Sequence, residues 1–155
     1  MPLEIERKFL VKNNNWENQV DSFVVIKQGF LSTDAERTVR IRISDEKAFL
    51  TIKGKSTGAT RTEFEYSIPH NEAVQLLKLC KPTIIEKVRF FINVNNHTWE
   101  LDVFEGGNLG LIIAEIELNS EDETFDLPDW VGEEVTGDVR YYNSILSKKG
   151  FMSWE

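Results

Sequence analysis

Polar and apolar residues alternate along most of the chain, in short segments that are separated by turn residues. Successive side chains of an extended strand point to opposite faces, so this pattern is typical of strands with one polar and one apolar face. It predicts strands at residues 3–11, 23–31, 37–44, 47–54, 60–67, 84–94, 97–105 and 111–119. The sequence therefore favours a mainly β architecture.

Two segments show the three-to-four-residue spacing of apolar side chains that indicates a helix. Residues 71–80 are the first, with Asn71 as the expected N-cap and Pro82 just beyond the end. Residues 139–149 are the second, which Gly150 is expected to end. A shorter helical turn is predicted near Trp16. We expect the two longer helices to cover apolar strand faces.

The polar faces of seven predicted strands carry charges at every second position. The acidic positions are Glu4, Glu6, Glu63, Glu65, Glu100, Asp102, Glu115 and Glu117, and the basic positions are Lys8, Arg40, Arg42, Lys53, Lys55, Arg61, Lys87 and Arg89. The two sets balance, although the chain as a whole has a formal net charge of -8. The simplest interpretation is an ordinary antiparallel sheet with one solvated face. Such a face usually mixes Thr, Ser and Gln with its charges, whereas here Arg and Glu doublets are segregated by strand.

A closed antiparallel barrel of eight strands would gather these charges on its inner face. We therefore predict a mainly β, α+β fold: a closed tunnel barrel with a charged interior and a few flanking helices, including a C-terminal one. Charges enclosed away from water are costly unless they are paired, solvated or coordinated. Arg and Lys bind phosphate oxygens, and carboxylates without His or Cys beside them suit Mg²⁺ or Mn²⁺. The predicted ligands are a small polyanion and a divalent metal ion.

Composition narrows the classes of protein that fit. The length of 155 residues and the 41% hydrophobic content suit a single domain over residues 1–155. The net charge disfavours an extended contact with nucleic acid, and no apolar run is long enough to span a membrane. A single cysteine, Cys80, and a charged N-terminal strand in place of a signal peptide favour the cytoplasm. The apolar exterior exceeds what short helices can cover, so it could pair two copies in a homodimer.

The charged motifs, taken in order, resemble those of the CYTH superfamily of triphosphate tunnel metalloenzymes. The resemblance begins with Glu4-x-Glu6-x-Lys8, which is similar to the ExExK signature, and ends with Arg140-Tyr141-Tyr142-Asn143. Between them stand Gln28-Gly29-Phe30-Leu31, Arg40-x-Arg42, Lys53, Glu63-x-Glu65, Lys87-x-Arg89, Glu100-x-Asp102, Glu115-x-Glu117 and Val135-Thr136-Gly137-Asp138. Phe30 departs from the pattern, because Tyr is common there. The resemblance implies a tunnel barrel and metal-assisted hydrolysis of a phosphoanhydride.

Charge chemistry and the resemblance together imply roles for these residues. Carboxylates from the first and last barrel strands hold a metal ion in the family, which points to Glu4, Glu6 and Glu117, with Glu115 in support. The basic residues expected to hold phosphate oxygens are Lys8, Arg40, Arg42, Lys53, Lys55, Arg61, Lys87 and Arg89. The remaining carboxylates, Glu63, Glu65, Glu100 and Asp102, are candidate catalytic residues that could hold a second metal ion, orient the attacking water or pair with arginines. The sequence does not separate these three roles.

The substrate expected from the resemblance is inorganic tripolyphosphate, which small bacterial members convert to pyrophosphate and phosphate. Three alternatives stay open. The same tunnel forms cyclic AMP from ATP in class IV adenylyl cyclases, and it hydrolyses thiamine or nucleoside triphosphates in other members. A non-catalytic module that binds polyphosphate is the third alternative, although it would not need so many carboxylates beside the phosphate ligands.

Overall fold

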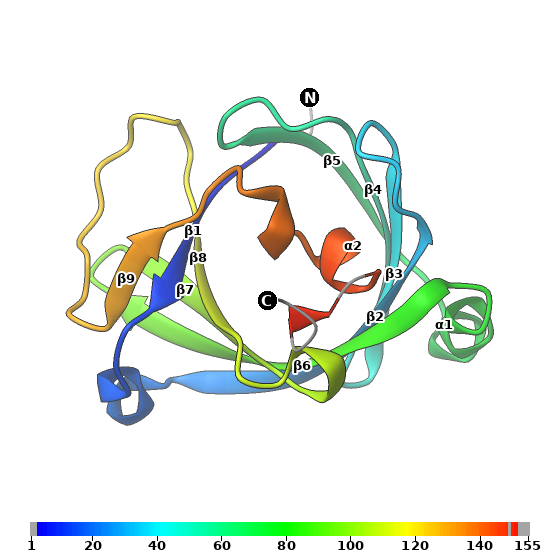
Figure 1. The fold of residues 1–155 in the computed structure, drawn as a ribbon, viewed down its shortest axis with the longest axis horizontal. Coiled ribbons are helices and arrows are strands. Elements are labelled where there is room, and N and C mark those ends of the chain that lie inside the picture. The colour runs from blue at the N-terminus through cyan, green and yellow to red at the C-terminus, as the bar shows by residue number, and fades with distance from the viewer. Residues whose placement is uncertain (1–2, 149, 152–155) are drawn as a thin grey trace.

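A closed barrel dominates the computed structural model, which describes residues 3–148 and 150–151 (Figure 1). Its strands are β1 (Leu3–Val11), β2 (Ser22–Ser32), β3 (Thr38–Ser44), β4 (Lys47–Lys53), β5 (Thr60–Ser67), β6 (Lys81–Val94), β7 (His97–Phe104), β8 (Ile112–Glu117) and β9 (Val131–Glu134). The helical elements are α1 (His70–Leu77), α2 (Asn143–Leu146) and three 3-10 turns, η1 (Asn15–Gln19), η2 (Gly106–Asn108) and η3 (Val139–Tyr141). All eight predicted strands are present, and η1 is the turn expected near Trp16.

Strand β1 closes the barrel by pairing on both sides. The strand order is β5-β4-β3-β2-β6-β7-β8-β1-β9, and β5 pairs with β1 as well. Glu4 lies opposite Arg61 of β5, whereas Glu6 lies opposite Glu117 of β8. β9 adds to the outer part of β1, with Phe9 opposite Glu134. The sequence did not predict β9, because four residues are too few to show an alternating pattern.

The interior of the barrel has a charged part and an apolar part. Alternation along β6 places Ile85 on the same face as Lys87 and Arg89, and alternation along β8 places Ile113 on the same face as Glu115. Phe30, Ile85, Phe104, Leu111 and Ile113 form a buried cluster with Val135, Tyr141 and Leu146 of the C-terminal segment. Figure 1 shows α2 within the ring of strands. The C-terminal segment therefore plugs the apolar end of the tunnel.

Both predicted helices differ in extent from the structure. The C-terminal helix expected at 139–149 is broken into η3 and α2 by Tyr142, whose backbone is extended (φ −69°, ψ 132°). It also lies inside the barrel instead of over its outer surface, because Tyr141 and Leu146 pack on the interior cluster. Its expected end at Lys149 lies outside the described residues. Helix α1 begins at His70 after Pro69, so Asn71 is not its N-cap, and it ends at Leu77.

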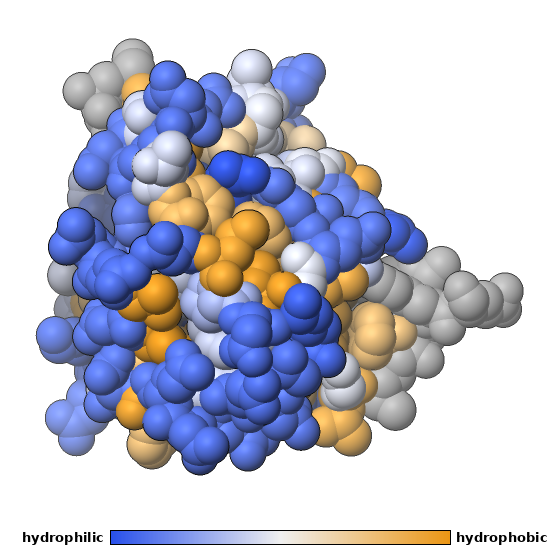
Figure 2. Space-filling model, turned by 90° about the vertical axis from the view of Figure 1, so that its left-hand side faces the viewer, coloured by the Kyte–Doolittle hydropathy of each residue, from blue (hydrophilic) through white to orange (hydrophobic). Residues whose placement is uncertain are grey.

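The outer apolar faces are covered by loops and by α1. Trp99, Ile116 and Phe9 pack with Trp130 and the partly buried Phe125, which come from the segment that follows β8. Figure 2 shows this side of the molecule, where apolar residues appear in patches between polar ones. On the other side, Ala73 of α1 packs on Ile41 and Ala48. No helix in the described part of the chain is both long and apolar enough to cross a membrane.

Gly29 of β2 sits where the strand passes close to the segment after α1. A Cβ atom added there would lie 2.6 Å from Cβ of Cys80 and 2.8 Å from Cδ1 of Ile84. We expect Gly29→Ala to lower the free energy of unfolding by about 1–3 kcal/mol, because the overlap must be relieved by shifting packed groups. Urea denaturation measures this change. Gly107→Ala is the control, since nothing lies within 4 Å of a Cβ at that position; equal midpoints for both variants would contradict the expectation.

Candidate active site

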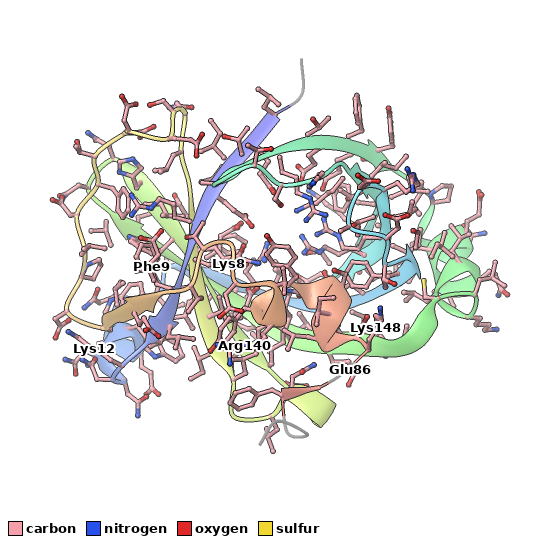
Figure 3. The ribbon with its side chains drawn as sticks, turned by 45° about the horizontal axis from the view of Figure 1, so that its top comes forward. Lys8, Phe9, Lys12, Glu86, Arg140 and Lys148 are labelled. Atoms are coloured by element: carbon pink, nitrogen blue, oxygen red, sulfur yellow. The ribbon has the colours of Figure 1, made fainter. Side chains whose placement is uncertain are left out.

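A cavity of about 290 Å³ occupies the charged part of the tunnel. Its lining includes all but two of the sixteen charged residues that the alternating pattern singles out. These are Glu4, Glu6, Lys8, Arg40, Arg42, Lys53, Arg61, Glu63, Glu65, Lys87, Arg89, Glu100, Glu115 and Glu117. Figure 3 shows Lys8 on the inner side of β1 and Phe9 on its outer side, as the period of a strand requires. The charged strand faces therefore converge on one enclosed space.

The two remaining residues lie outside that lining. Lys55 lies two residues beyond the end of β4, is exposed and does not border the cavity. Asp102 is on the inner face of β7 but is fully buried behind Lys87 and Arg89. Its carboxylate contacts both of these side chains, which belong to the basic wall of the cavity (Lys8, Arg40, Arg42, Lys87 and Arg89). Asp102 therefore holds part of this wall in place.

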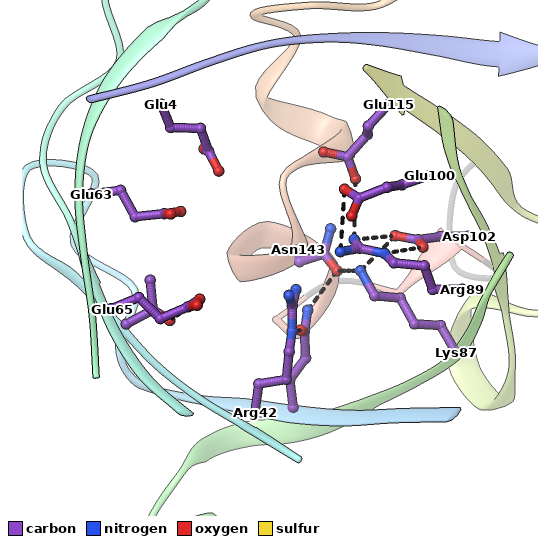
Figure 4. A network of polar contacts seen from close by, with 12 residues as sticks. Glu4, Arg42, Glu63, Glu65, Lys87, Arg89, Glu100, Asp102, Glu115 and Asn143 are labelled. Atoms are coloured by element: carbon purple, nitrogen blue, oxygen red, sulfur yellow. Dashed lines mark hydrogen bonds and ion pairs between the residues drawn. The ribbon is translucent and has the colours of Figure 1, made fainter. Parts of the chain in front are cut away.

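The buried carboxylate of Asp102 binds two basic side chains at once. Its oxygens accept from Nε and Nη2 of Arg89 at 2.8 and 2.9 Å, and Nζ of Lys87 lies 2.7 Å from Oδ2 (Figure 4). Burial by itself raises the pKa of Asp102, but Arg89 and Lys87 outweigh burial and hold it well below its usual range. The Arg89 pKa is raised despite burial, first by Asp102 and then by Glu100. This network fixes two basic side chains at the cavity wall.

Three other basic side chains at the cavity have no acidic partner within 4.0 Å among the described residues, and Arg40 has only a distant one, with Nη2 3.7 Å from Oε2 of Glu65. In the chain as described, no carboxylate oxygen lies within 4.0 Å of the charged nitrogens of Lys8, Arg42 or Arg61. Arg40 is 8% exposed and its Nε has no hydrogen-bond partner among the described residues. Burial lowers the pKa of Arg42, and so do the neighbouring Arg40 and Arg89. Such a group of cations, desolvated and mutually repelling, is suited to an anion with several oxygens.

The opposite wall is acidic. Glu6 and Glu117 lie directly opposite each other on β1 and β8, where like charges are destabilising. Burial raises the pKa of Glu117, and Glu4, Glu100 and Glu63 raise it further. Burial also raises the pKa of Glu4, although Nζ of Lys53 lies 3.0 Å from Oε1 of Glu4. These carboxylates need a positive charge that the chain does not fully supply.

A hard divalent cation fits this donor set. Glu4, Glu6, Glu115 and Glu117 offer only oxygen ligands, which Mg²⁺ and Mn²⁺ prefer. Burial raises the pKa of Glu115, as does the charge of Glu6, which indicates crowded carboxylates. Among the residues described, no three acidic, His or Cys side chains already form a compact metal site. Mg²⁺ usually keeps several waters and shares its ligands with substrate phosphates, so it does not require a compact cage of protein ligands.

The C-terminal segment adds polar groups that the sequence did not single out as site residues. Tyr142 and Asn143 both line the cavity. The ring of Tyr142 lies 5.1 Å from Nζ of Lys8 and 5.8 Å from Cζ of Arg61, within the range of cation–π attraction. These residues stand outside any strand, so alternation gives no signal for them. Only the resemblance of Arg140-Tyr141-Tyr142-Asn143 to a family motif marked the segment.

We expect anion binding at this site to take up a proton above neutral pH. Burial lowers the pKa of Lys87 to about 7, and Arg89 and Arg42 lower it too, against the pull of Asp102. Nζ is therefore mostly neutral in the free protein at about pH 8, and a bound phosphate would favour its charged form and raise that pKa. Affinity for the anion should then fall as the pH rises from about 7.

Calorimetry checks this linkage. Titration of tripolyphosphate in EDTA, in two buffers of different ionisation enthalpy at about pH 8, gives the number of protons taken up. At about pH 8, wild type should take up as much as about one proton more than Lys87→Met when tripolyphosphate binds. At about pH 5.5 this difference should vanish, because Nζ of Lys87 is already charged in the free protein. Equal uptake by both proteins at the higher pH would show that Lys87 is charged throughout.

Comparisons with known proteins agree with this geometry. The CYTH domain model matches residues 2–143. An inorganic triphosphatase of Acetivibrio thermocellus is 44% identical over 156 residues, which cover 100% of this chain and 99% of the relative. An inorganic triphosphatase of Nitrosomonas europaea is 35% identical over 148 residues, covering 93% and 96%. The crystal structure of the inorganic triphosphatase NE1496 is 34% identical, with a TM-score of 0.65 over 93% of this chain and 97% of that one. This chain belongs to the CYTH domain family.

Proposed function

We propose that this chain is a divalent-metal-dependent triphosphatase that hydrolyses inorganic tripolyphosphate to pyrophosphate and phosphate. One observation carries the proposal: Lys8, Arg42 and Arg61, which have no carboxylate within 4.0 Å among the described residues, line the same cavity as Glu6 and Glu117, which lie opposite each other on neighbouring strands. A triphosphate together with a divalent cation would complement both walls. The names of the two relatives, each an inorganic triphosphatase, support the same substrate class.

The residues divide into a phosphate-binding set and a metal-binding set. Phosphate oxygens would be held by Lys8, Arg40, Arg42, Lys53, Arg61, Lys87 and Arg89. Mg²⁺ or Mn²⁺ would be held by Glu4, Glu6, Glu115 and Glu117, where it would supply Lewis-acid charge next to the phosphates. We leave Lys55 out of the first set because it does not border the cavity.

The basic residues would stabilise charge during the reaction itself. Water attacks a terminal phosphorus, the bond from that phosphorus to the bridging oxygen breaks, and pyrophosphate leaves with the bond's electrons. Arg and Lys side chains neutralise the charge on the transferred group and on the leaving group. Glu63, Glu65 and Glu100 line the same cavity and are the carboxylates available to orient the water and to receive its proton.

The proposal also covers domain organisation, cellular location and oligomeric state. We propose that residues 1–155 act as one domain in the cytoplasm. Exposed apolar side chains remain on the outer face of β4 and β5, where Ile52 lies opposite Phe64. Such a surface is compatible with a homodimer, and light scattering at micromolar concentration tests for it.

A substrate panel tests the function. Tripolyphosphate, thiamine triphosphate and ATP are each incubated with Mg²⁺ or Mn²⁺, or with EDTA, and the products are identified chemically. Fast release of phosphate and pyrophosphate from tripolyphosphate, abolished by EDTA, is the expected result. Cyclic AMP as the main product from ATP would contradict it, and so would tight binding of tripolyphosphate without turnover.

A pair of arginine variants links the activity to the cavity. Arg42→Ala removes a cation that lines the cavity, whereas Arg37→Ala removes an exposed one that pairs with Asp34. The first should lower kcat/KM by roughly a hundredfold, as expected when a charged hydrogen bond to a reacting phosphate is lost. The second should leave kcat/KM unchanged.

A further inference from the structure

The side-chain amide of Asn143 joins the C-terminal plug to the basic wall of the cavity. Its Oδ1 accepts from Nζ of Lys87 at 2.8 Å and from Nε2 of Gln28 at 2.7 Å. Both partners are donors, so the oxygen of the amide must face them, which assigns the orientation of the group. Figure 4 shows the nitrogen of Asn143 turned away from Lys87 and toward the open space of the cavity.

That nitrogen is a free donor at the cavity. Asn143 lines the cavity, and in the part of the chain that the structure describes its Nδ2 donates to no protein acceptor. Two of the side chains near it are themselves donors: Lys87, which binds its Oδ1, and Arg42, whose Nε donates to Oε1 of Gln28 at 2.7 Å. A group that meets all of these donors must be rich in acceptor oxygens.

We propose that Asn143 is a substrate-positioning residue, which binds a phosphate oxygen through Nδ2 while its Oδ1 holds Lys87 and Gln28 in place. The inference rests on the proposed function, because it needs a phosphate ligand in the cavity. Through Gln28 the same amide also orients Arg42, so one side chain of the plug aligns two cations of the wall. The plug is thus part of the binding site as well as a closure of the tunnel.

Replacing Asn143 with Asp separates this role from a structural one. Asp has the same shape, and its carboxylate can still accept from Lys87 and Gln28, so the plug keeps its attachment. It cannot donate to phosphate, however, and it adds a negative charge where the substrate binds. The added charge alone would also weaken anion binding, so the loss of affinity in Asn143→Ala, which adds no charge, is what separates the missing donor from charge repulsion.

Steady-state kinetics and a direct binding assay with tripolyphosphate give the readout. Asn143→Asp should raise KM and the dissociation constant in EDTA by about a hundredfold, and Asn143→Ala by about tenfold. In both variants kcat should stay within about threefold, since substrate and transition state lose the same contact. Asn143→Asp should keep the wild-type melting temperature, which leaves the test valid even where Asn143→Ala is poorly folded.

Lys148→Ala is the matched control, because Lys148 is exposed on the same segment. It should bind and turn over tripolyphosphate as wild type does. Wild-type affinity in Asn143→Asp would overturn the inference while leaving the proposed function intact. A wild-type protein that neither binds nor hydrolyses tripolyphosphate would instead overturn the proposed function.

Discussion

Changing Glu6 to Gln is expected to slow tripolyphosphate hydrolysis by at least about a hundredfold while tripolyphosphate still binds. Gln keeps the shape of the side chain but removes the charge that attracts a divalent cation. Glu6 faces Glu117 directly across β1 and β8, so this change leaves the proposed metal site with one ligand charge fewer. Glu4→Gln should act alike, since Glu4 lines the same cavity. The basic wall stays intact, which preserves substrate affinity.

Turnover at saturating Mg²⁺ or Mn²⁺ and calorimetric binding in EDTA measure the two effects separately. Glu46→Gln is the control, since Glu46 is exposed in the turn between β3 and β4 and should leave both quantities unchanged. Near-normal metal-dependent turnover in Glu4→Gln and Glu6→Gln would mean that the carboxylates of β1 hold no metal. The central argument from the alternating charges would then fail.

Changing Asp102 to Asn should cost about 3–5 kcal/mol of folding free energy, because it removes the carboxylate to which the buried, always charged Arg89 donates two hydrogen bonds. Asp102 is 0% exposed and Lys87 1%, so their contact is shielded from solvent. The same pair makes stability depend on pH. The Asp102 pKa is lowered in the folded state, so its contribution is complete above its unfolded pKa of about 3.9 and is lost as the pH falls through the lower, folded value.

Urea denaturation at about pH 7 gives the cost, and repeating it toward acid tests the pH dependence. Asp122→Asn is the control, since Asp122 is exposed and its carboxylate accepts a hydrogen bond from Ser120, two residues earlier in the same loop. The difference between wild type and Asp102→Asn should shrink as the pH falls below about 3.9. A cost under about 1 kcal/mol at neutral pH would show that solvent reaches this network.

Much of the barrel and of its lining could be predicted because a strand repeats every two residues. Once Glu4 is assigned to one face of β1, Glu6 and Lys8 must share it, and the same holds for Arg40 with Arg42 on β3. A closed sheet has one inner face, so seven charged strands could only converge. This is why fourteen of the sixteen residues line the cavity.

The sequence did not predict how deeply a side chain on the inner face is buried, where strands end, or where the C-terminal segment packs. Alternation gives the face of Asp102 but not that Lys87 and Arg89 would separate it from the cavity. Lys55 lies beyond the end of β4, where the two-residue period no longer applies. The helical pattern at 139–149 does not indicate which strand face the segment packs on. In the structure it packs inside the barrel, on the interior cluster that contains Phe104 and Ile113.

Because β1 pairs with β5 on one side and with β8 on the other, the cavity can be completed only late in synthesis of the chain. β1 precedes the other barrel strands along the chain, yet its partner β8 is the last of them and β9 comes later still. Neighbouring pairs such as β3–β4 and β6–β7 need only short loops and can form early, whereas closure by β1 joins distant segments. On the ribosome, Glu6 and Lys8 must therefore wait for their strand partner until β8 has emerged, whereas Glu4 can meet Arg61 of β5 earlier. The cavity is therefore complete only after β8 has paired with β1.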